Sequence, residues 1–298
     1  MNTTQRDAHP TDLPQLLRYD AGDDILAFTT TRQGGVSEGN YQAFNINEYC
    51  GDNPAHTAQN RHLLALAIDE ALKQAPFDAP SCYHFDETRI VMPHQVHGTE
   101  VKRIDESYFS LTANDRKAAV EGVDALITNT PGTLIGVSTA DCIPLIFIDK
   151  THHAIGVAHA GWRGTVARIA QKTIAAMSQA YNTNAAELHA IIGPGISQGA
   201  FEVGDEVYEA FAQARFDMKV IAQRMGSNHK WHIDLWAANR LQMTEAGLSD
   251  AAIHCAQLCT WTHADRLFSA RRLGIQSGRL FTAAMIAKGK TLREQLEP

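Results

Sequence analysis

Short apolar runs, many of them rich in β-branched residues, alternate along the chain with polar and glycine-containing turns. Runs of this kind predict β-strands. We expect strands at residues 24–31, 89–92, 122–128, 133–138, 143–149, 153–159, 189–192, 231–234, 253–255 and 279–286. Helical spacing of apolar residues predicts helices at 54–74, from Trp162 onward, at 203–214 and at 235–246. The mixture favours one mixed α/β (α+β) domain at 21–298, after a polar extension at 1–20 and with an exposed excursion at 107–121.

Two adjacent apolar runs, 143–149 and 153–159, should form a β-hairpin. If its loop has two or four residues and is symmetric about residues 150 and 151, Cys142 lies directly opposite His159 on the same face. Their Cβ atoms would then be about 4.5–5.5 Å apart, a separation at which a thiolate and an imidazole can share one zinc ion. A three-residue loop would put the two side chains on opposite faces. The hairpin therefore predicts a metal site, provided that the loop is even in length.

A third ligand must come from another segment, and His94 and His97 lie in a strand-to-loop transition. The residue pattern alone does not choose between them. Three protein ligands would leave one position for water, which is typical of catalytic zinc. Asp141, next to Cys142, is a candidate general base or a residue that orients a ligand histidine. The alternative is a turn aspartate that is bonded to nearby backbone.

Two further segments carry candidate groups for an anionic or polar ligand. The predicted helix begins near Trp162 and Arg163, where free backbone N–H groups and a forked guanidinium favour a phosphate or a carboxylate. The long loop at 32–47 contains Arg32 and Asn45, a cation and an amide of the kinds that hold polar ligands. The alternatives are a solvated arginine at a strand-to-helix turn, a surface arginine in the loop and an asparagine that caps a turn.

Composition excludes several classes of protein. The formal net charge of −7 over 298 residues argues against a nucleic-acid or membrane-surface binder. The N-terminus lacks the apolar core of a secretory signal, and no apolar run approaches membrane-spanning length, so we expect a cytoplasmic protein. Five cysteines, an odd count in a long chain, favour reduced thiols. His254, Cys255, Cys259 and His263 resemble a zinc knot by type, but they share one short segment, and we expect buried thiols there.

The chain contains QVHG (95–98), STADC (138–142), AHAGWRG (158–164), IGPGI with FEVGDEV (192–207) and FSARR with GR (268–279). In this order the motifs resemble the YfiH family, also called the polyphenol oxidoreductase or laccase-domain family, which has the purine nucleoside phosphorylase FAMIN as a relative. The resemblance implies a layered α/β/β/α-type domain like that of cytotoxic necrotizing factor catalytic domains. It also implies one zinc ion held by His97, Cys142 and His159, and so it selects His97 over His94.

Family members similar to this chain cleave purine nucleosides with phosphate and can deaminate adenosine. The resemblance therefore implies small-molecule substrates, namely phosphate and adenosine, inosine, guanosine or methylthioadenosine. We expect a monomer or a weak homodimer, although the sequence itself does not reveal whether two chains associate. Phosphate would be held by Arg32, Arg163 and the helix start at Trp162, with Asn45 as a ligand-holding amide. Zinc-activated hydroxide and Asp141 would serve deamination.

Two positions depart from the family pattern and affect the expected shape of the pocket. Ala270 stands where an aromatic residue is usual, and Ala200 stands where a cysteine is common. Neither departure touches the expected metal ligands.

Three rival functions use the same residues. A copper-dependent polyphenol oxidase would need several copper ions and many histidines, but the chain has no His-x-His pair. A thiol hydrolase would use Cys142 as nucleophile and His159 as base, which a zinc-bound thiolate excludes. A zinc-stabilised binding module, linked to cell-wall precursors, is the non-enzymatic alternative, and an open coordination position counts against it.

Overall fold

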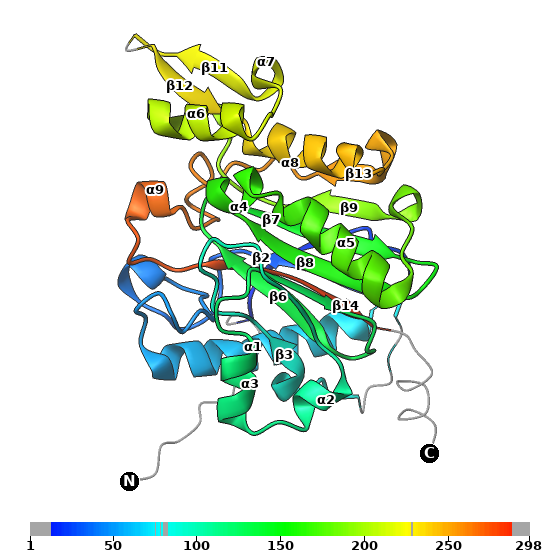
Figure 1. Ribbon diagram of the computed structural model, residues 1–298. Helices are drawn as coiled ribbons and strands as arrows, with labels where there is room; N and C mark the ends of the chain where they lie inside the picture. Colours follow the sequence, from blue (N-terminus) through cyan, green and yellow to red (C-terminus); the bar gives the residue numbers. More distant parts are fainter. Residues whose placement is uncertain (1–12, 75, 78, 80–82, 228, 288–298) are drawn as a thin grey trace.

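Two β-sheets packed face to face form the centre of the molecule, and helices cover both outer faces (Figure 1). The computed structural model describes residues 13–287 apart from 75, 78, 80–82 and 228. Residues 1–12 of the predicted extension, residues 288–298 of the predicted domain and Cys82 therefore lie outside the described residues. The α/β/β/α layering confirms the expected fold class.

The larger sheet has six strands in the order β13-β9-β7-β8-β5-β4. Its parallel pairs are β13 with β9 and β4 with β5, and the other neighbours are antiparallel. The strands are β4 (Val101–Arg103), β5 (Ala125–Thr128), β7 (Ile143–Asp149), β8 (Ala154–Ala160), β9 (His189–Ile192) and β13 (Ile253–Cys255). Five of them correspond to predicted apolar runs, whereas β4, with the sequence Val-Lys-Arg, was not among the predicted strands.

The second sheet has five strands in the order β1-β2-β14-β6-β3, in which only β3 and β6 are parallel. The strands are β1 (Leu16–Tyr19), β2 (Ile25–Thr30), β3 (Ile90–Val91), β6 (Leu134–Thr139) and β14 (Leu280–Ile286). A small third sheet, in the order β10-β12-β11, contains β10 (Glu202–Val203), β11 (Ala222–Met225) and β12 (Lys230–Ile233). The strand β1 falls inside the predicted extension and pairs with β2, so residues 16–19 are part of the sheet.

Helices make up the outer layers of the molecule. They are α1 (Pro54–Leu72), α2 (Glu106–Phe109), α3 (Ala113–Ala119), α4 (Trp162–Val166), α5 (Ile169–Tyr181), α6 (Asp205–Gln213), α7 (Met218–Ile221), α8 (Leu235–Glu245) and α9 (Ala270–Leu273). None of the helices among the described residues is long and apolar enough to cross a membrane.

Alternate residues of β7 show how the layers are held together. Ile146 and Ile148 point between the two sheets, whereas Leu145 and Phe147 point to the opposite face, where they share a core with α5, α6 and α8. On the far side of the five-stranded sheet, α1 packs on the outer faces of β2 and β14. Because both faces of each sheet are buried, the strands read as continuous apolar runs rather than as alternating ones.

The hairpin of β7 and β8 differs from the expected register by two residues. Asp149 pairs with Ala154, which leaves a four-residue loop at 150–153, and Pro144 rather than Cys142 lies opposite His159. The prediction that Cys142 lies directly opposite His159 is therefore wrong. Since the shift is even, both side chains still belong to the same face of the hairpin.

The predicted long helix from Trp162 is two helices. Arg168 has φ 67° and separates α4 from α5. Its guanidinium is anchored by Glu245 at 2.9 Å and by the carbonyl of Ala214 at 2.9 Å. The break leaves α4 a single short helix beside the end of β8, while α5 lies along the sheet (Figure 1).

The excursion at 107–121 was expected to be aperiodic, but most of it is helical. Asp105 caps α2 by accepting from the N–H of Ser107, and Thr112 caps α3 by accepting from the N–H of Asp115. Neither helix has a buried residue. Hydrophobic periodicity therefore gives no signal here, and the capping residues were the only signs of these helices.

Candidate metal centre

Three side chains from separate segments converge at one end of the two sheets. His97 lies in the loop between β3 and β4, Cys142 lies in the bend before β7, and His159 lies on β8. Their ligand atoms all lie within 4.8 Å of one another. Zinc bond lengths of about 2.0–2.3 Å put neighbouring ligand atoms roughly 3.5 Å apart, so small side-chain movements would complete the site. Two imidazoles and a thiolate are a donor set that suits zinc.

The backbone at two of these segments is held in the left-handed region. His97 has φ 62°, and Asp141, directly before Cys142, has φ 85°. Such conformations cost about 1–3 kcal/mol for residues other than glycine and are common at functional sites. Gly161 is constrained by the ligands themselves. A Cβ atom there would lie 2.8 Å from Cδ2 of His97 and 3.0 Å from Sγ of Cys142.

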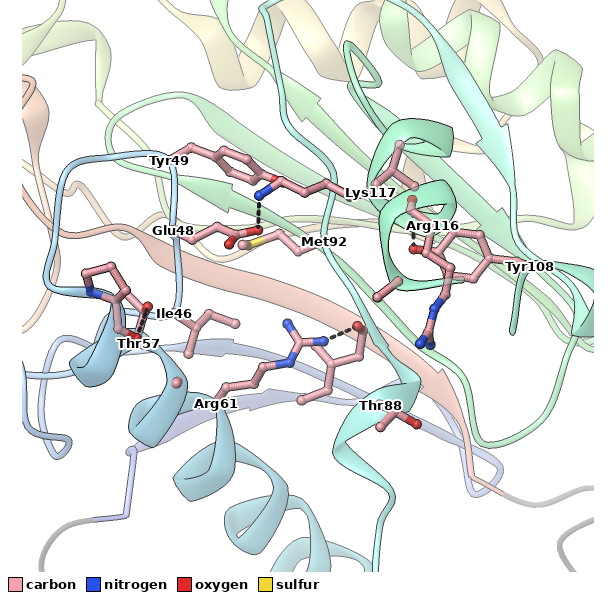
Figure 2. Close-up of a pocket in the computed structure, with 15 residues that line it drawn as sticks. Ile46, Glu48, Tyr49, Thr57, Arg61, Thr88, Met92, Tyr108, Arg116 and Lys117 are labelled. Atoms are coloured by element: carbon pink, nitrogen blue, oxygen red, sulfur yellow. Dashed lines mark hydrogen bonds and ion pairs between the residues drawn. The ribbon is translucent and has the colours of Figure 1, made fainter. Parts of the chain in front are cut away.

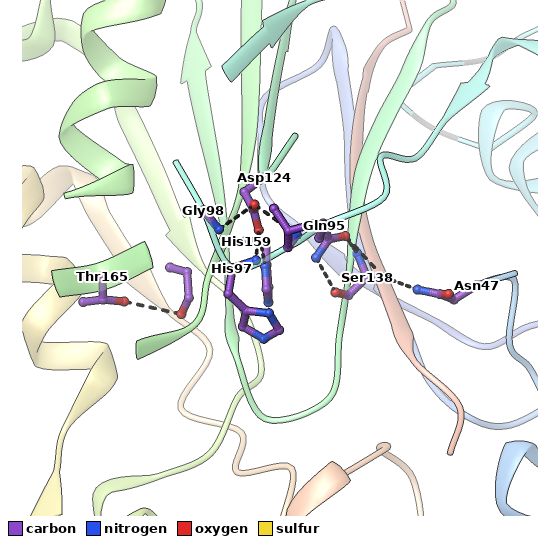
Figure 3. A network of polar contacts seen from close by, with 10 residues as sticks. Asn47, Gln95, His97, Gly98, Asp124, Ser138, His159 and Thr165 are labelled. Carbon is purple, nitrogen blue, oxygen red and sulfur yellow. Dashed lines mark hydrogen bonds and ion pairs between the residues drawn. The ribbon is translucent and has the colours of Figure 1, made fainter. Parts of the chain in front are cut away.

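Asp124 connects two of the three ligands (Figure 3). Its carboxylate is fully buried and accepts hydrogen bonds from the N–H groups of Val96, His97 and Gly98 at 3.2, 3.0 and 2.7 Å. Nδ1 of His159 lies 2.8 Å from the same carboxylate, so this nitrogen donates to Asp124 and Nε2 is left for a metal ion. Sequence analysis missed Asp124, because a lone aspartate at the start of a strand carries no metal signature.

Burial and charge act against each other at Cys142 and His159. Burial disfavours the thiolate, but His159 and His97 outweigh it and lower the pKa of Cys142 to about 6. Burial likewise disfavours the imidazolium, but the Cys142 thiolate and Asp124 raise the pKa of His159 to about 9. Near neutral pH the pair is thus a thiolate and an imidazolium, and a metal ion would take the place of the proton.

A cavity of about 250 Å³ lies beside the three ligands, and we call it the metal-centre cavity. The other side chains that line it are Asn47, Tyr49, Cys50, His94, Gln95, Ser138, Thr139, Ala140, Ala270, Ile275 and Arg279. The amide of Asn47 donates to the hydroxyl of Ser138 at 2.6 Å, and Oε1 of Gln95 accepts from the N–H of Ser138 at 2.7 Å (Figure 3). One wall is therefore a fixed polar network.

His94 lines the cavity but does not belong to the ligand cluster. Its ring stacks on Tyr49 with centroids 4.2 Å apart, and its Nδ1 lies 2.7 Å from a carboxylate oxygen of Glu121. The geometry agrees with the implied choice of His97.

Asp141 is held by bonds away from the ligands. One carboxylate oxygen accepts from the hydroxyl of Thr260 at 2.6 Å, and the other accepts from the N–H of Arg271 at 2.6 Å. The ligand histidine is oriented by Asp124 instead. The structure therefore supports the alternative reading of Asp141 as a turn residue, and its catalytic role stays a prediction.

Arg32 and Asn45, predicted to hold substrate, do not line the metal-centre cavity. The guanidinium of Arg32 donates to the carbonyls of Gln42 and Ala264 at 2.8 and 2.7 Å and lies over the Phe268 ring. Asn45 is fully buried, and its Oδ1 accepts from the N–H of Arg279 at 3.1 Å. Both residues organise loops that carry lining residues.

Trp162 and Arg163 also lie outside the lining of this cavity. The exposed guanidinium of Arg163 lies 4.2 Å from the centroid of the Trp162 ring. The helix start predicted to bind an anion belongs to α4, which has only five residues. Its dipole is correspondingly small.

Of the two cysteines expected to be buried between His254 and His263, Cys259 is buried, whereas Cys255 is partly exposed. The four cysteines among the described residues are free thiols. In this part of the chain, the metal ligands form the only group of three or more metal-binding side chains, so the segment from His254 to His263 is not such a group. Cys259 is buried and accepts from the N–H of Ser197.

The match to a family model decides the classification. Residues 26–287 match the model described as multi-copper polyphenol oxidoreductase laccase. The chain belongs to this family. It is 44% identical over 265 residues to a purine nucleoside phosphorylase of Bacteroides thetaiotaomicron, covering 89% of this chain and 93% of that protein.

Two further comparisons support the same family. The chain is 40% identical over 258 residues to adenosine deaminase RL5 of an unknown prokaryotic organism, covering 87% of this chain and 92% of that protein. The crystal structure of the YfiH protein of Bacillus licheniformis superimposes with a TM-score of 0.78 and 25% identity, covering 92% of this chain and 97% of that one. The resemblance to the YfiH family is confirmed. Among the two departures noted in the sequence, Ala270 lines the metal-centre cavity.

Proposed function

We propose that this YfiH-family chain is a zinc-dependent purine nucleoside phosphorylase that also deaminates adenosine. The observation that carries the proposal is the group of His97, Cys142 and His159, with a buried carboxylate on the outer nitrogen of His159. This is an arrangement typical of catalytic zinc. The names of the relatives, a purine nucleoside phosphorylase and an adenosine deaminase, support the substrate class.

The chain's own residues divide into those that hold the metal and those that shape the cavity. A bound zinc ion would supply a Lewis acid and a water of lowered pKa. Asp124 keeps the proton of His159 on Nδ1 and fixes the 96–98 loop, so that both imidazoles face one point. The network of Asn47, Gln95 and Ser138 keeps the opposite wall rigid, which favours one orientation of a sugar.

Arg279 is the best candidate for holding phosphate. Among the described residues that line the cavity, it is the one with a permanent positive charge. Its two terminal nitrogens donate to the carbonyls of Ser277, Gly278 and Ile275, and these bonds fix the position of the guanidinium. A preorganised cation at this place would position phosphate against the sugar carbon. The sequence instead suggested that phosphate binds to Arg32, Arg163 and the start of α4 at Trp162. On that hypothesis, replacement of Arg163 rather than Arg279 should weaken phosphate binding.

The test is to incubate the purified protein with adenosine, with and without phosphate, and to separate adenine, inosine and hypoxanthine. We expect adenine only when phosphate is present and inosine in both conditions, and Cys142→Ala should abolish every product. Arg279→Gln should raise the KM for phosphate by about tenfold or more and leave deamination nearly unchanged. Arg163→Gln is the matched control. A raised KM in the Arg163 variant alone would place phosphate at α4 instead.

A copper-dependent polyphenol oxidase is the second candidate, because the matching family model is described as a multi-copper laccase. Against it stands the single three-residue metal group in the described part of the chain, since oxidation of phenols by copper needs several ions. Metal analysis of protein purified without added copper separates the two candidates. Several copper ions per chain, with oxidation of phenols, would replace the phosphorylase proposal.

A further inference from the structure

A second cavity, of about 530 Å³, lies away from the three ligands, between α1, α3 and β3 (Figure 2). We call it the α1–α3 cavity. Its wall has an apolar part, with Ile46, Ile90 and Met92. It also has a cationic part, with Arg61 from α1 and with Arg116 and Lys117 from α3 (Figure 2). The volume is in the range of sites for small organic ligands.

Positive charge exceeds negative charge around this cavity. Lys117 is paired with Glu48 at 3.4 Å, and its ammonium lies 5.3 Å from the centroid of the Tyr49 ring. No carboxylate among the described residues lies within ion-pair distance of Arg61 or Arg116. Glu48 is the only carboxylate among the described lining residues, and Lys117 already occupies it.

Arg61 is the most constrained of these cations. One terminal nitrogen donates to the backbone carbonyls of Ile90 and Glu87, which holds the guanidinium at the cavity wall. Burial lowers the pKa of Arg61, Arg116 lowers it further, and Glu87, Glu48 and Tyr108 act in the opposite direction. A partly buried guanidinium without an anionic partner gains from an anion that enters the cavity.

We propose that the α1–α3 cavity binds a small organic phosphate, with the phosphate at Arg61 and Arg116 and the organic part against Ile46, Ile90 and Met92. Two guanidinium groups suit phosphate because their N–H donors match its oxygens. The apolar wall favours a ligand with a sugar or a base over the bare ion. This binding site does not depend on cleavage of nucleosides at the metal centre, so the inference goes beyond the proposed function.

The α1–α3 cavity also has a physical connection to the metal centre. Tyr49 lines both cavities, and its ring stacks on His94 in the wall of the metal-centre cavity. A ligand in the α1–α3 cavity would therefore contact a side chain that shapes the other site.

The experiment is a calorimetric titration of the full chain with adenosine 5′-monophosphate, ribose 5-phosphate, inorganic phosphate and adenosine. We expect one molecule of adenosine monophosphate per chain, bound more tightly than inorganic phosphate or adenosine. Ribose 5-phosphate that binds equally well would assign the affinity to the sugar phosphate, and weaker binding would assign part of it to the base. Both results support the proposal. Adenosine and inorganic phosphate can also bind at the metal centre, so their binding is compared between the native chain and Arg116→Gln. If either one binds as tightly as the monophosphate and Arg116→Gln weakens that binding, the proposal is wrong.

Variants assign the binding to one cavity. Arg116→Gln should weaken binding about tenfold or more, because α3 is exposed and the side chain of Arg116 makes no structural bond to the described residues. Arg61→Gln is the less suitable variant, since it also removes bonds to β3. Lys102→Gln, at an exposed position of β4, is the matched control and should bind normally.

Binding must also persist in Cys142→Ala, which separates this site from the metal centre. Unchanged binding in Arg116→Gln, or loss in Cys142→Ala, would overturn the proposal.

Discussion

Replacement of Asp124 by asparagine is the sharpest test of how the metal centre is built. Each carboxylate oxygen accepts two hydrogen bonds: Oδ1 from the N–H of His97 and from Nδ1 of His159, and Oδ2 from the N–H groups of Val96 and Gly98. Asparagine has nearly the same shape but offers one oxygen and one NH₂ group. Whichever oxygen is replaced, the NH₂ group of asparagine would point at two N–H donors that have no other acceptor in this fully buried place.

The cost follows from the number of unpaired donors. A buried donor without a partner costs about 1–3 kcal/mol, so two of them should lower the free energy of unfolding by about 2–6 kcal/mol. Loss of a partner of a ligand histidine typically weakens metal binding about 10–100-fold, or about 1.4–2.7 kcal/mol. Because Oδ1 serves His159 and Oδ2 holds the loop of His97, either orientation of the asparagine disturbs a ligand.

Metal affinity is best measured by competition with a chromophoric chelator, and stability by urea unfolding. Asp149→Asn is the matched control, because the Asp149 carboxylate is also buried and lies 2.9 Å from Nδ1 of His152 at the other end of β7. The control should lose stability but keep its metal affinity within about twofold. Native-like zinc affinity in a folded Asp124→Asn protein would show that the carboxylate does not orient the ligands.

Three more outcomes follow from the structure. Gly161→Ala should weaken metal binding, because the added Cβ would lie within 3.0 Å of atoms of His97 and Cys142, whereas Gly199→Ala, with nothing within 4 Å, should not; chelator competition compares the two. Zinc binding should release about one proton between pH 6 and 9, where Cys142 is already a thiolate and the pair keeps one proton on His159. Below pH 6 it should release at least one more, because the Cys142 thiol must then also lose its proton. Calorimetry in buffers of different ionisation enthalpy counts the protons, and a release that does not vary with pH would contradict the assigned pKa values. Because folding lowers the pKa of Asp149, its ionised carboxylate stabilises the fold above the unfolded pKa of about 4. This contribution to the free energy of unfolding is lost as the pH falls below that value. In urea unfolding between pH 2 and 6, the stability of Asp149→Asn should therefore fall less steeply with pH than that of the native chain, and equal slopes would refute the assignment.

Most strands could be predicted because both faces of each sheet are buried, so their sequences are uninterrupted apolar runs. The bounds of β7, β9 and β13 are those expected from the sequence. Elements without buried residues, such as α2 and α3, gave no such signal, and β1 was hidden in a polar segment. Hydrophobic periodicity arises from burial, so it does not reveal an element that contributes little to the core.

The candidate site was predictable where one local element or a motif carries the residue. Cys142 and His159 flank a single hairpin, and the motif resemblance supplied His97. Asp124 could not be found in this way, because it acts through four donors that come from two other segments. Arg32 shows the opposite case: its residue type suits phosphate, but its side chain does not line the metal-centre cavity.

The hairpin shows why a partly wrong register still predicted that Cys142 and His159 lie together. Side chains on a strand alternate with a period of two, so a shift of two residues moves Cys142 along the strand without moving it to the other face. The observed register puts residue 161 opposite Cys142, by continuation of the pairs of Ile143 with Ala160 and of Pro144 with His159. That position is a glycine, and His97 reaches into the space that a side chain would fill there. The two-residue offset thus gives the third ligand its place, which direct opposition of Cys142 and His159 would not have provided.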